Sequence, residues 1–445
     1  MGRASATAAR FRSILRGFDH MGLVSPHGNV LANLLNVEWT GHLARAVLKR
    51  CRKTPPGLQD LLGRHTISAA ELVQAYEPAL LRVVAALLRE GCSVGASTAP
   101  LHGHLHCCAL FGWSRVAGVL LRAGAAADVA GENGLLPQHL AQAHGWGNVE
   151  VVLPCPAEQY GPRSISNSSD ATAGDMRSEF YCTSARRGAA ESRPEWALAS
   201  LPACSVTYGN RQVDEVDGEL LSVREFDERF FRWKRPLLIR GGVGAAPALR
   251  WTPTDLIAST KVEVDGTFRD IDVPLSSIPY PHEWMPRSIA DADQRWGTIA
   301  DVLAGDPGYV FLDMEDHPGL ASFAAADLDL PALLPPVLGE QNEIVALPQF
   351  SLGQSGTGAP WHWHQDAFNA CLVGERVWYL RPPARALMSR QPVRQGVPMA
   401  HNSYYAVQRP GDVLYVPEMW SHSVVNRVLS VAVSLEFGTA GTEQK

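Results

Sequence analysis

The sequence predicts a multidomain protein in which an all-α repeat solenoid is followed by a mainly-β domain. Three observations predict this order. Apolar and glycine positions recur every 33 residues in the first third of the chain, a polar stretch follows, and short apolar runs separated by Gly, Pro and Asp come after it. We divide the chain as follows: a disordered basic N-terminus (1–29), a helical unit (30–153), a flexible linker (154–200), a β domain (201–438) and a tail (439–445).

Composition excludes several classes of protein. With 46% hydrophobic and 19% charged residues, the chain has the balance of a globular protein. A net charge of −6 gives no basic footprint, so we expect no nucleic-acid partner, and no apolar run reaches membrane-spanning length. Eight cysteines without paired spacing indicate reduced thiols and a cytoplasmic or nuclear location. Four arginines and no acid in residues 1–18 leave organelle targeting open.

The helical unit is predicted from its period. The segment LLREG (87–91) recurs as LLRAG (120–124), and the Gly112-Trp113 pair recurs as Gly145-Trp146. A helix-pair repeat of this length resembles the ankyrin family. The resemblance implies a helical cap from residue 30, one degenerate unit near residues 67–94, and two clearer units ending at residue 153. It also implies a concave surface that binds a partner or substrate protein.

A histidine and cysteine cluster inside this unit could suggest zinc: His102, His104, His106, Cys107 and Cys108. The repeat favours a structural role, because His106 occupies the same position in its unit as His139 does in the next. Ligands that alternate on one turn also cannot converge tetrahedrally without a second pair. We therefore predict no metal here.

The linker is predicted from a shift in composition. Residues 154–194 are rich in Ser, Gly, Ala, Arg and Pro and hold few large apolar side chains. We expect the two halves to fold separately, and a fragment of about residues 200–445 to keep any metal site of the β domain.

Two segments of the β domain contain the candidate site. His362 and His364 lie two apart in a strand-like pattern, which places both imidazoles on one face of a strand. His422 follows about sixty residues later, just after the buried run 413–416. Two ligands from one strand and a third from a distant strand are typical of a facial non-haem Fe(II) site with open positions.

The motifs around these histidines resemble those of the JmjC branch of the Fe(II)/2-oxoglutarate oxygenases. They are GTGAPWHWH (356–364), GERVWYLRPP (374–383) and GDVLYVPEMWSH (411–422), and the resemblance covers residues 205–437. It implies a cupin-like double-stranded β-helix, or jelly-roll, that uses Fe(II) as cofactor and 2-oxoglutarate as co-substrate. A preceding helix is expected at residues 221–231.

The resemblance also implies roles for individual residues. His362, His364 and His422 would hold the metal, and no catalytic residue separate from the metal site is expected. The distal carboxylate of 2-oxoglutarate would contact Arg376, Thr357 and Tyr309, and Asn369 would lie near the metal. Four tryptophans would either wall the pocket or pack in the β core: Trp361, Trp363, Trp378 and Trp420.

This sequence departs from the family pattern at three positions. His364 replaces the acidic ligand, Arg376 replaces the lysine that pairs with 2-oxoglutarate, and Ala359 replaces a small hydroxyl residue. An alternative register uses His364 and Asp366 as the ligand pair, which restores a carboxylate. We favour His362 and His364, because their distance from Gly356 fits the pattern.

The function that the resemblance implies is a 2-oxoglutarate-dependent dioxygenase, most simply a protein hydroxylase whose repeats recruit a protein. No chromatin-reader pattern, cysteine-rich zinc module or basic tail is present, which favours hydroxylation over the alternative of lysine demethylation. The three departures support a further alternative. In it the protein is a non-catalytic scaffold with a degenerate site.

Overall fold

The structure is a computed structural model, and it describes residues 64, 66–89, 104–131, 134–153, 196, 204–206, 209–265, 267–276, 295–328 and 344–439. The predicted basic N-terminus, most of the predicted cap and linker, and most of the tail lie outside the described residues. Within the described ranges, no helix is both long and apolar enough to cross a membrane.

The described helical unit contains two helix pairs in the same arrangement. They are α6 (His104–Phe111) with α7 (Ser114–Arg122), and α8 (Pro137–Ala143) with α9 (Gly147–Glu150). Corresponding helices begin 33 residues apart. Gly112 and Gly145 turn the chain between the helices of each pair, with left-handed φ values of 80° and 75° that glycine adopts at low cost. The assignment to the ankyrin family stays a prediction.

The predicted first repeat unit has a different structure. The chain forms a short strand, β1 (Thr66–Ser68), and then one continuous 21-residue helix, α5 (Ala69–Arg89), instead of a helix pair. The position equivalent to Gly112 is Ala79, so no left-handed turn interrupts this helix. Thr66, the last residue of the predicted helical cap, therefore lies in a strand that pairs with the β domain.

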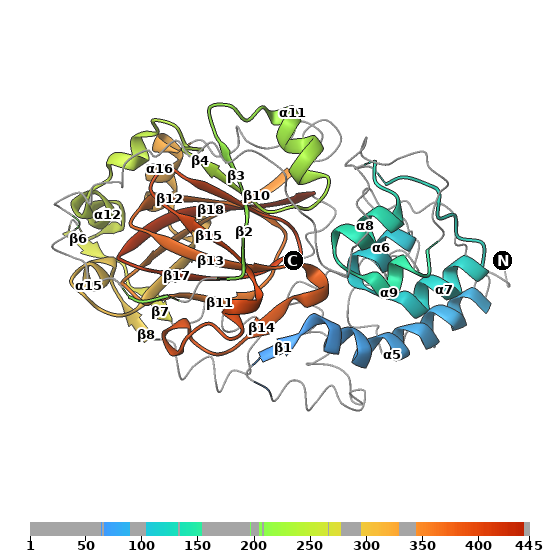
Figure 1. Cartoon of the computed structure of the whole chain (residues 1–445). Coiled ribbons are helices and arrows are strands. Elements are labelled where there is room, and N and C mark those ends of the chain that lie inside the picture. The colour runs from blue at the N-terminus through green and yellow to red at the C-terminus, as the bar shows by residue number, and fades with distance from the viewer. Residues whose placement is uncertain are drawn as a thin grey trace, which may run out of the picture.

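The β domain consists mainly of two facing sheets (Figure 1). The nine-stranded sheet has the order β3 (Asp214–Asp217), β4 (Leu237–Arg240), β16 (Val413–Val416), β12 (Asp366–Val373), β18 (Ser430–Thr439), β10 (Ile344–Gly353), β9 (Tyr309–Asp313), β7 (Val273–Ser276) and β8 (Arg295–Gly297). The five-stranded sheet has the order β11 (Gly358–His362), β17 (Ser421–Asn426), β13 (Arg376–Arg381), β15 (Tyr404–Gln408) and β2 (Arg211–Gln212). This confirms a mainly-β domain and is consistent with the expected jelly-roll.

Short helices and a hairpin complete the β domain. The predicted helix at 221–231 is α11 (Val223–Phe226) continued by the π-helical η2 (Asp227–Phe231). α12 (Pro253–Ser259), α15 (Ile299–Leu303) and α16 (Pro318–Asp327) cover the side opposite the helical unit (Figure 1). α12 and α15 each begin with a Thr–Asp capping box. The remaining elements are the hairpin β5 (Lys261–Val264) and β6 (Thr267–Asp270), and the 3₁₀ turns η3 (Pro247–Arg250), η4 (Met314–Asp316), η6 (Pro383–Arg385), η7 (Val393–Gln395) and η8 (Ala400–Asn402).

The helical unit packs directly against the β domain. β1 pairs antiparallel with β14 (Leu387–Ser389). The buried side chains of β1 and α5–α9 pack with four residues of the β domain in one hydrophobic cluster, and we call this whole cluster the shared core. The four residues of the β domain are Trp363, Ala386, Met388 and Met419. The expectation that the two halves fold separately therefore needs correction, because neither half covers its own apolar surface completely.

The predicted linker also ends earlier than expected. Trp196 lies within it, yet its side chain is only 3% exposed and packs in the core of the β domain. Its indole N–H donates a hydrogen bond of 3.1 Å to the carbonyl oxygen of Trp251. A tryptophan that is buried and hydrogen-bonded in this way belongs to the β domain.

Candidate metal centre

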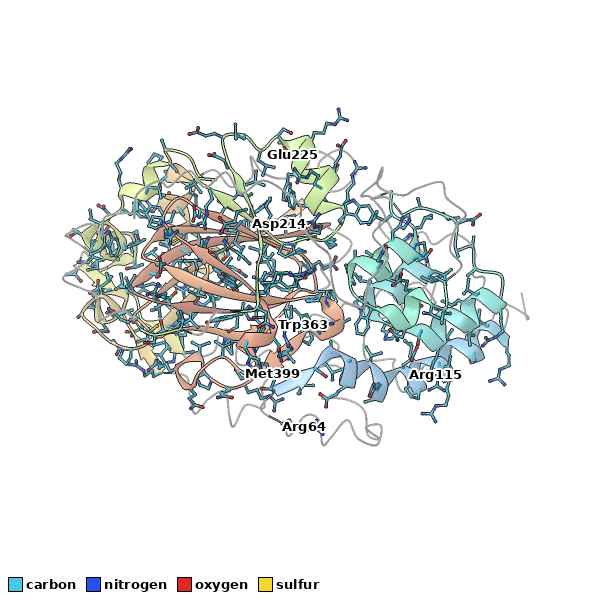
Figure 2. All side chains as sticks on the ribbon, viewed as in Figure 1. Arg64, Arg115, Asp214, Glu225, Trp363 and Met399 are labelled. Atoms are coloured by element: carbon cyan, nitrogen blue, oxygen red, sulfur yellow. The ribbon has the colours of Figure 1, made fainter. Side chains whose placement is uncertain are left out.

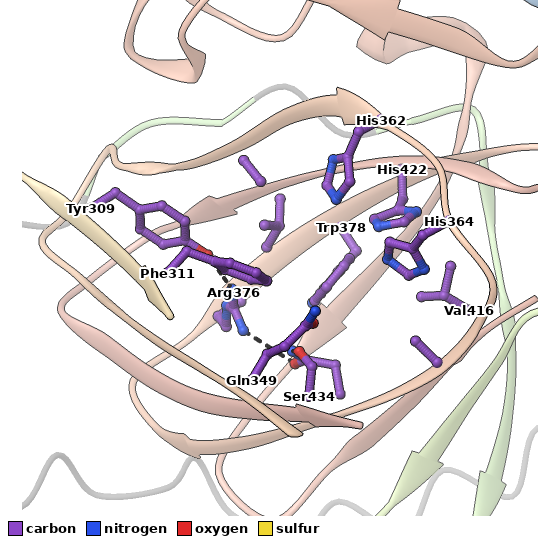
Figure 3. A pocket seen from close by; sticks show the side chains of 14 residues that line it. Tyr309, Phe311, Gln349, His362, His364, Arg376, Trp378, Val416, His422 and Ser434 are labelled. Atoms are coloured by element: carbon purple, nitrogen blue, oxygen red, sulfur yellow. Dashed lines mark hydrogen bonds between the residues drawn. The ribbon is translucent and has the colours of Figure 1, made fainter. Parts of the chain in front are cut away.

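Three histidines on or next to β11 and β17 of the five-stranded sheet converge on a cavity between the sheets. β11 and β17 pair antiparallel with His362 opposite His422, and their ring centroids lie 4.2 Å apart. The ring of His364 lies 4.6 Å from that of His422 and 5.6 Å from that of His362. One nitrogen of each ring lies within 4.8 Å of the others, and Figure 3 shows the rings facing one another. We call these residues the histidine triad.

In each ring of the triad, a hydrogen bond occupies Nδ1 and leaves Nε2 available to bind a metal ion. Nδ1 of His362 lies 2.7 Å from the carbonyl oxygen of Pro360, and Nδ1 of His364 lies 2.7 Å from that of Gln365. Nδ1 of His422 lies 2.9 Å from the carbonyl oxygen of Trp420. A carbonyl only accepts, so each Nδ1 carries the proton and each Nε2 keeps its lone pair. Metal-binding histidines are commonly oriented by such outer bonds.

The surroundings of His362 and His422 keep these two imidazoles neutral. Burial, reinforced by His364, lowers the pKa of His362 to about 3. Burial, with the fields of the other two rings, lowers the pKa of His422 well below its usual range. Only a deprotonated nitrogen binds a metal ion, so these rings are ready to coordinate at neutral pH.

His364 reaches the site in a different way from the one expected. β11 ends at His362, and His364 lies beyond it, in the connection to β12. The pairing of β11 with β17 shifts register between Ala359 and His362. Because such an irregularity bends a strand, the alternation of side chains on one straight strand does not apply here.

The alternative ligand Asp366 faces away from the cavity. Its neighbours Ala367 and Asn369 line the cavity, and Asp366 projects from the opposite face of β12. There its carboxylate lies 2.5 Å from Nζ of Lys234 and accepts a 2.7 Å hydrogen bond from the Tyr415 hydroxyl. The structure therefore does not bring His364 and Asp366 together as a ligand pair.

Arg376 is a buried cation at the other end of the cavity. Its side chain is 1% exposed, and the hydrogen bonds that it makes with the described residues go to neutral groups. It donates to Asn426 at 3.2 Å, to Asn369 at 3.1 Å and to the hydroxyl of Tyr309 at 3.2 Å. None of these partners balances its charge. Because burying an unpaired charge is costly, the cavity is suited to an anionic ligand.

Of the four residues expected near 2-oxoglutarate or the metal, three line the cavity: Arg376, Tyr309 and Asn369 (Figure 3 labels the first two). Thr357 does not. Its hydroxyl donates to the carbonyl oxygen of Gln354 at 2.7 Å and accepts from Asn426 at 3.1 Å. The contact predicted for Thr357 is therefore indirect, because Asn426 lies between this hydroxyl and Arg376. Of the four tryptophans, only Trp378 is among the lining residues.

The structure adds two polar residues that the motifs did not indicate. Gln349 lines the cavity and donates to Glu436 at 3.3 Å. The Glu436 carboxylate lies 4.0 Å from Nδ1 of His364, so a negative charge stands beside the triad although no carboxylate is a ligand. The only sequence signal for either residue is its place on a strand, and their proximity depends on the pairing of β10 with β18.

The cavity itself is small. Its volume is about 30 Å³, which is room for about two water molecules. Apart from the residues already described, its walls are apolar or weakly polar: Phe311, Ala359, Ala367, Val416, Val424 and Ser434. The arrangement can hold one metal ion and a small anion that reaches Arg376.

Comparison with known proteins supports the C-terminal assignment. The JmjC domain family matches residues 342–444. JmjC domain-containing protein 8 of Homo sapiens is 28% identical over 99 residues, which is 20% of this chain and 37% of the relative. The Rattus norvegicus protein of that name is 29% identical over 101 residues, covering 20% and 36%. The chain thus spans little more than a third of the curated relatives that it matches.

A solved structure, that of E. coli ycfD, is 18% identical and covers 49% of this chain and 54% of its own, at a TM-score of 0.33. The family match and the curated relatives establish a JmjC domain at the C-terminal end, with homology to JmjC domain-containing protein 8. The helical unit lies outside the region matched by the domain family.

Proposed function

We propose that the protein is an Fe(II)- and 2-oxoglutarate-dependent oxygenase that hydroxylates protein side chains. The observation that carries this proposal is the convergence of three imidazoles in the same cavity as a buried arginine whose hydrogen-bond partners among the described residues are all neutral. Fe(II) with 2-oxoglutarate and O2 would supply an oxidant for unactivated C–H bonds, and JmjC domains belong to the oxygenase type that uses them.

Within this proposal each residue has a physical task. The triad would hold Fe(II) through Nε2, with its Nδ1 protons anchored to backbone carbonyls. Arg376 would bind the distal carboxylate of 2-oxoglutarate, helped by the Tyr309 hydroxyl, and Asn369 would hold Arg376 in place. The apolar walls would exclude bulk water.

The helical unit would bind the protein substrate or another protein partner. This part of the proposal rests on the 33-residue repetition of helix pairs, since stacks of such pairs form extended protein-binding surfaces.

Metal binding gives the first test. His422→Ala should abolish stoichiometric Fe(II) or Mn(II) binding measured by calorimetry, because two remaining imidazoles hold a divalent ion weakly. His401→Ala is the matched control: this histidine is exposed and lies outside the cavity, so its loss should leave affinity unchanged. Equal affinity of wild type and His422→Ala would remove the triad as the metal site.

A non-catalytic scaffold is the second candidate function. The small volume of the cavity favours it, because 2-oxoglutarate has ten non-hydrogen atoms and would need side chains to move. The three departures from the family motif point in the same direction. Succinate release from 2-oxoglutarate by the metal-loaded protein would support the oxygenase, and its absence with intact metal binding would support the scaffold.

A further inference from the structure

We propose that the helical unit positions the histidine triad, so that the packing of helices α5–α9 and the metal affinity of the site are thermodynamically linked. This inference rests on the proposed metal centre. It assigns the helices a role in positioning the metal ligands, in addition to binding a partner. Its basis is that the residues next to the metal ligands in the chain are the same residues that the helices cover.

Two side chains connect the triad to the helices. Trp363 lies between His362 and His364, and Met419 lies three residues before His422; both belong to the shared core, at 5% and 6% exposure. Figure 2 places Trp363 at the end of the β domain that faces the helical unit. The backbone N–H of Met419 also donates to the carbonyl oxygen of His364 at 3.0 Å. A shift of either side chain would therefore move a ligand.

Met419 is held in an unusual backbone conformation. Its φ is 65°, in the left-handed region that costs a non-glycine residue free energy. Such a conformation persists when the surrounding structure over-determines it. Here that structure includes the helices, because the Met419 side chain is buried among them.

Backbone contacts give a second connection. The N–H of Ala69, at the start of α5, donates to the carbonyl oxygen of Ala386 at 2.9 Å, and β1 pairs with β14. On β14, the N–H of Leu387 donates to the hydroxyl of Ser421 at 2.9 Å. Ser421 directly precedes His422, so this chain of hydrogen bonds runs from the helical unit to a ligand of the site.

Buried charges give a third connection. Lys234 lies 2.5 Å from Asp366 and 3.6 Å from Glu418, the residue before Met419. Burial, with the nearby Glu418, raises the pKa of Cys107 in α6 to about 12. Burial, with the nearby Lys234, lowers the pKa of His144, after α8, to about 3. Cys107 and His144 of the helical unit thus lie close enough to this ion cluster to be affected by its charges.

The consequence follows from linkage. A facial metal site needs its ligands placed to within about 0.5 Å, which packing around them must supply. If helix packing favours that geometry, a bound metal ion must stabilise helix packing by the same free energy. A protein that binds the helices and loosens their contact would then lower metal affinity.

A pair of matched truncations separates positioning from general stability. Met388→Ala opens a cavity in the shared core, on β14, at a side chain that is 8% exposed and is not one of the proposed ligands. Leu275→Ala opens a similar cavity in the core on the far side of the β domain. Both should lower the unfolding midpoint, and only Met388→Ala should lower Mn(II) affinity, by about ten-fold. Equal Mn(II) affinities for the two variants would overturn the inference.

Hydrogen exchange on the full-length wild-type chain keeps the inference testable if Met388→Ala does not fold. Mn(II) should slow exchange at the amides of α6 and α8 and leave the β5–β6 hairpin unchanged. If Mn(II) binds without protecting these helices, the linkage is wrong and the metal centre stands. If wild type does not bind Mn(II), the metal centre itself fails and the linkage falls with it.

Discussion

The charge on each side chain around the histidine triad determines what the site can hold. At position 364 an imidazole stands where the family pattern has a carboxylate, and the nearby Asp366 is already paired with Lys234. His364→Ala should therefore cost at least about ten-fold in metal affinity. Asp366→Ala should leave metal affinity nearly unchanged and destabilise the fold by about 3 kcal/mol, because a buried lysine loses its closest partner. Calorimetry and urea unfolding measure the two effects, and the opposite ranking would move the site to the 364/366 register.

Arg376 is the residue whose charge a co-substrate would balance. Arg376→Gln should weaken 2-oxoglutarate binding by on the order of 1.5–3 kcal/mol, because a charge-assisted bond is lost, and should leave Mn(II) bound. Arg376→Lys keeps the positive charge and should recover part of that affinity. Titration of 2-oxoglutarate into the Mn(II)-loaded variants measures this. A wild-type protein without saturable 2-oxoglutarate binding would favour the scaffold.

At this scale, the sequence predicted the residues that belong to a linear motif. The triad, Arg376, Tyr309 and Asn369 line one cavity, because motif spacing on neighbouring strands survives folding, and their roles in binding stay predictions. Thr357 was misplaced because its hydroxyl turns to the nearby Gln354 carbonyl instead of the cavity. Glu436 and the Lys234–Asp366 pair were missed, since only the sheet register brings such distant residues together.

At the scale of elements, the pairing of β11 with β17 places His362 directly opposite His422. Burial and the neighbouring imidazole lower the pKa of His362 to about 3, and burial lowers that of His422 strongly. In the unfolded chain both have a pKa of about 6.5, so below that pH the unfolded state binds protons that the folded state does not. The metal-free protein should therefore lose stability as pH falls from about 6.5 towards 3.

Urea unfolding in a chelator at pH 7 and pH 5 tests this pH dependence. His422→Asn removes one titrating group, so its stability should change less between the two pH values than that of wild type. An identical change in wild type and variant would show that these strands do not hold neutral imidazoles.

The elements themselves were predicted with uneven success, for a physical reason. The strands β4, β9, β13, β16 and β18 are apolar runs between turn residues, and such runs form strands wherever both faces are buried. The helix at 221–231 was also predicted. β1 and β14 were not, because each has three residues and gains its stability only from a partner 323 positions away.

At the scale of the whole molecule, the shared core makes the β domain dependent on the helices. A fragment of residues 200–445 would expose the shared-core side chains and lose the Trp196 bond to Trp251. We expect it to aggregate, whereas a fragment beginning at residue 60 keeps both features and should stay soluble. Size-exclusion chromatography of the two fragments measures this. A monodisperse 200–445 fragment with wild-type Mn(II) affinity would restore the view that the halves are independent.

The pairing of β1 with β14 also determines how late during translation the two strands can meet. Thr66 and its partner Ser389 are 323 residues apart. At roughly 5–20 residues per second of translation, about 15–65 s pass between the synthesis of the two strands. During that interval Ile67 and the apolar side of the helices have no β domain to cover them. We therefore expect this apolar surface of the nascent chain to stay exposed until β14 is synthesised.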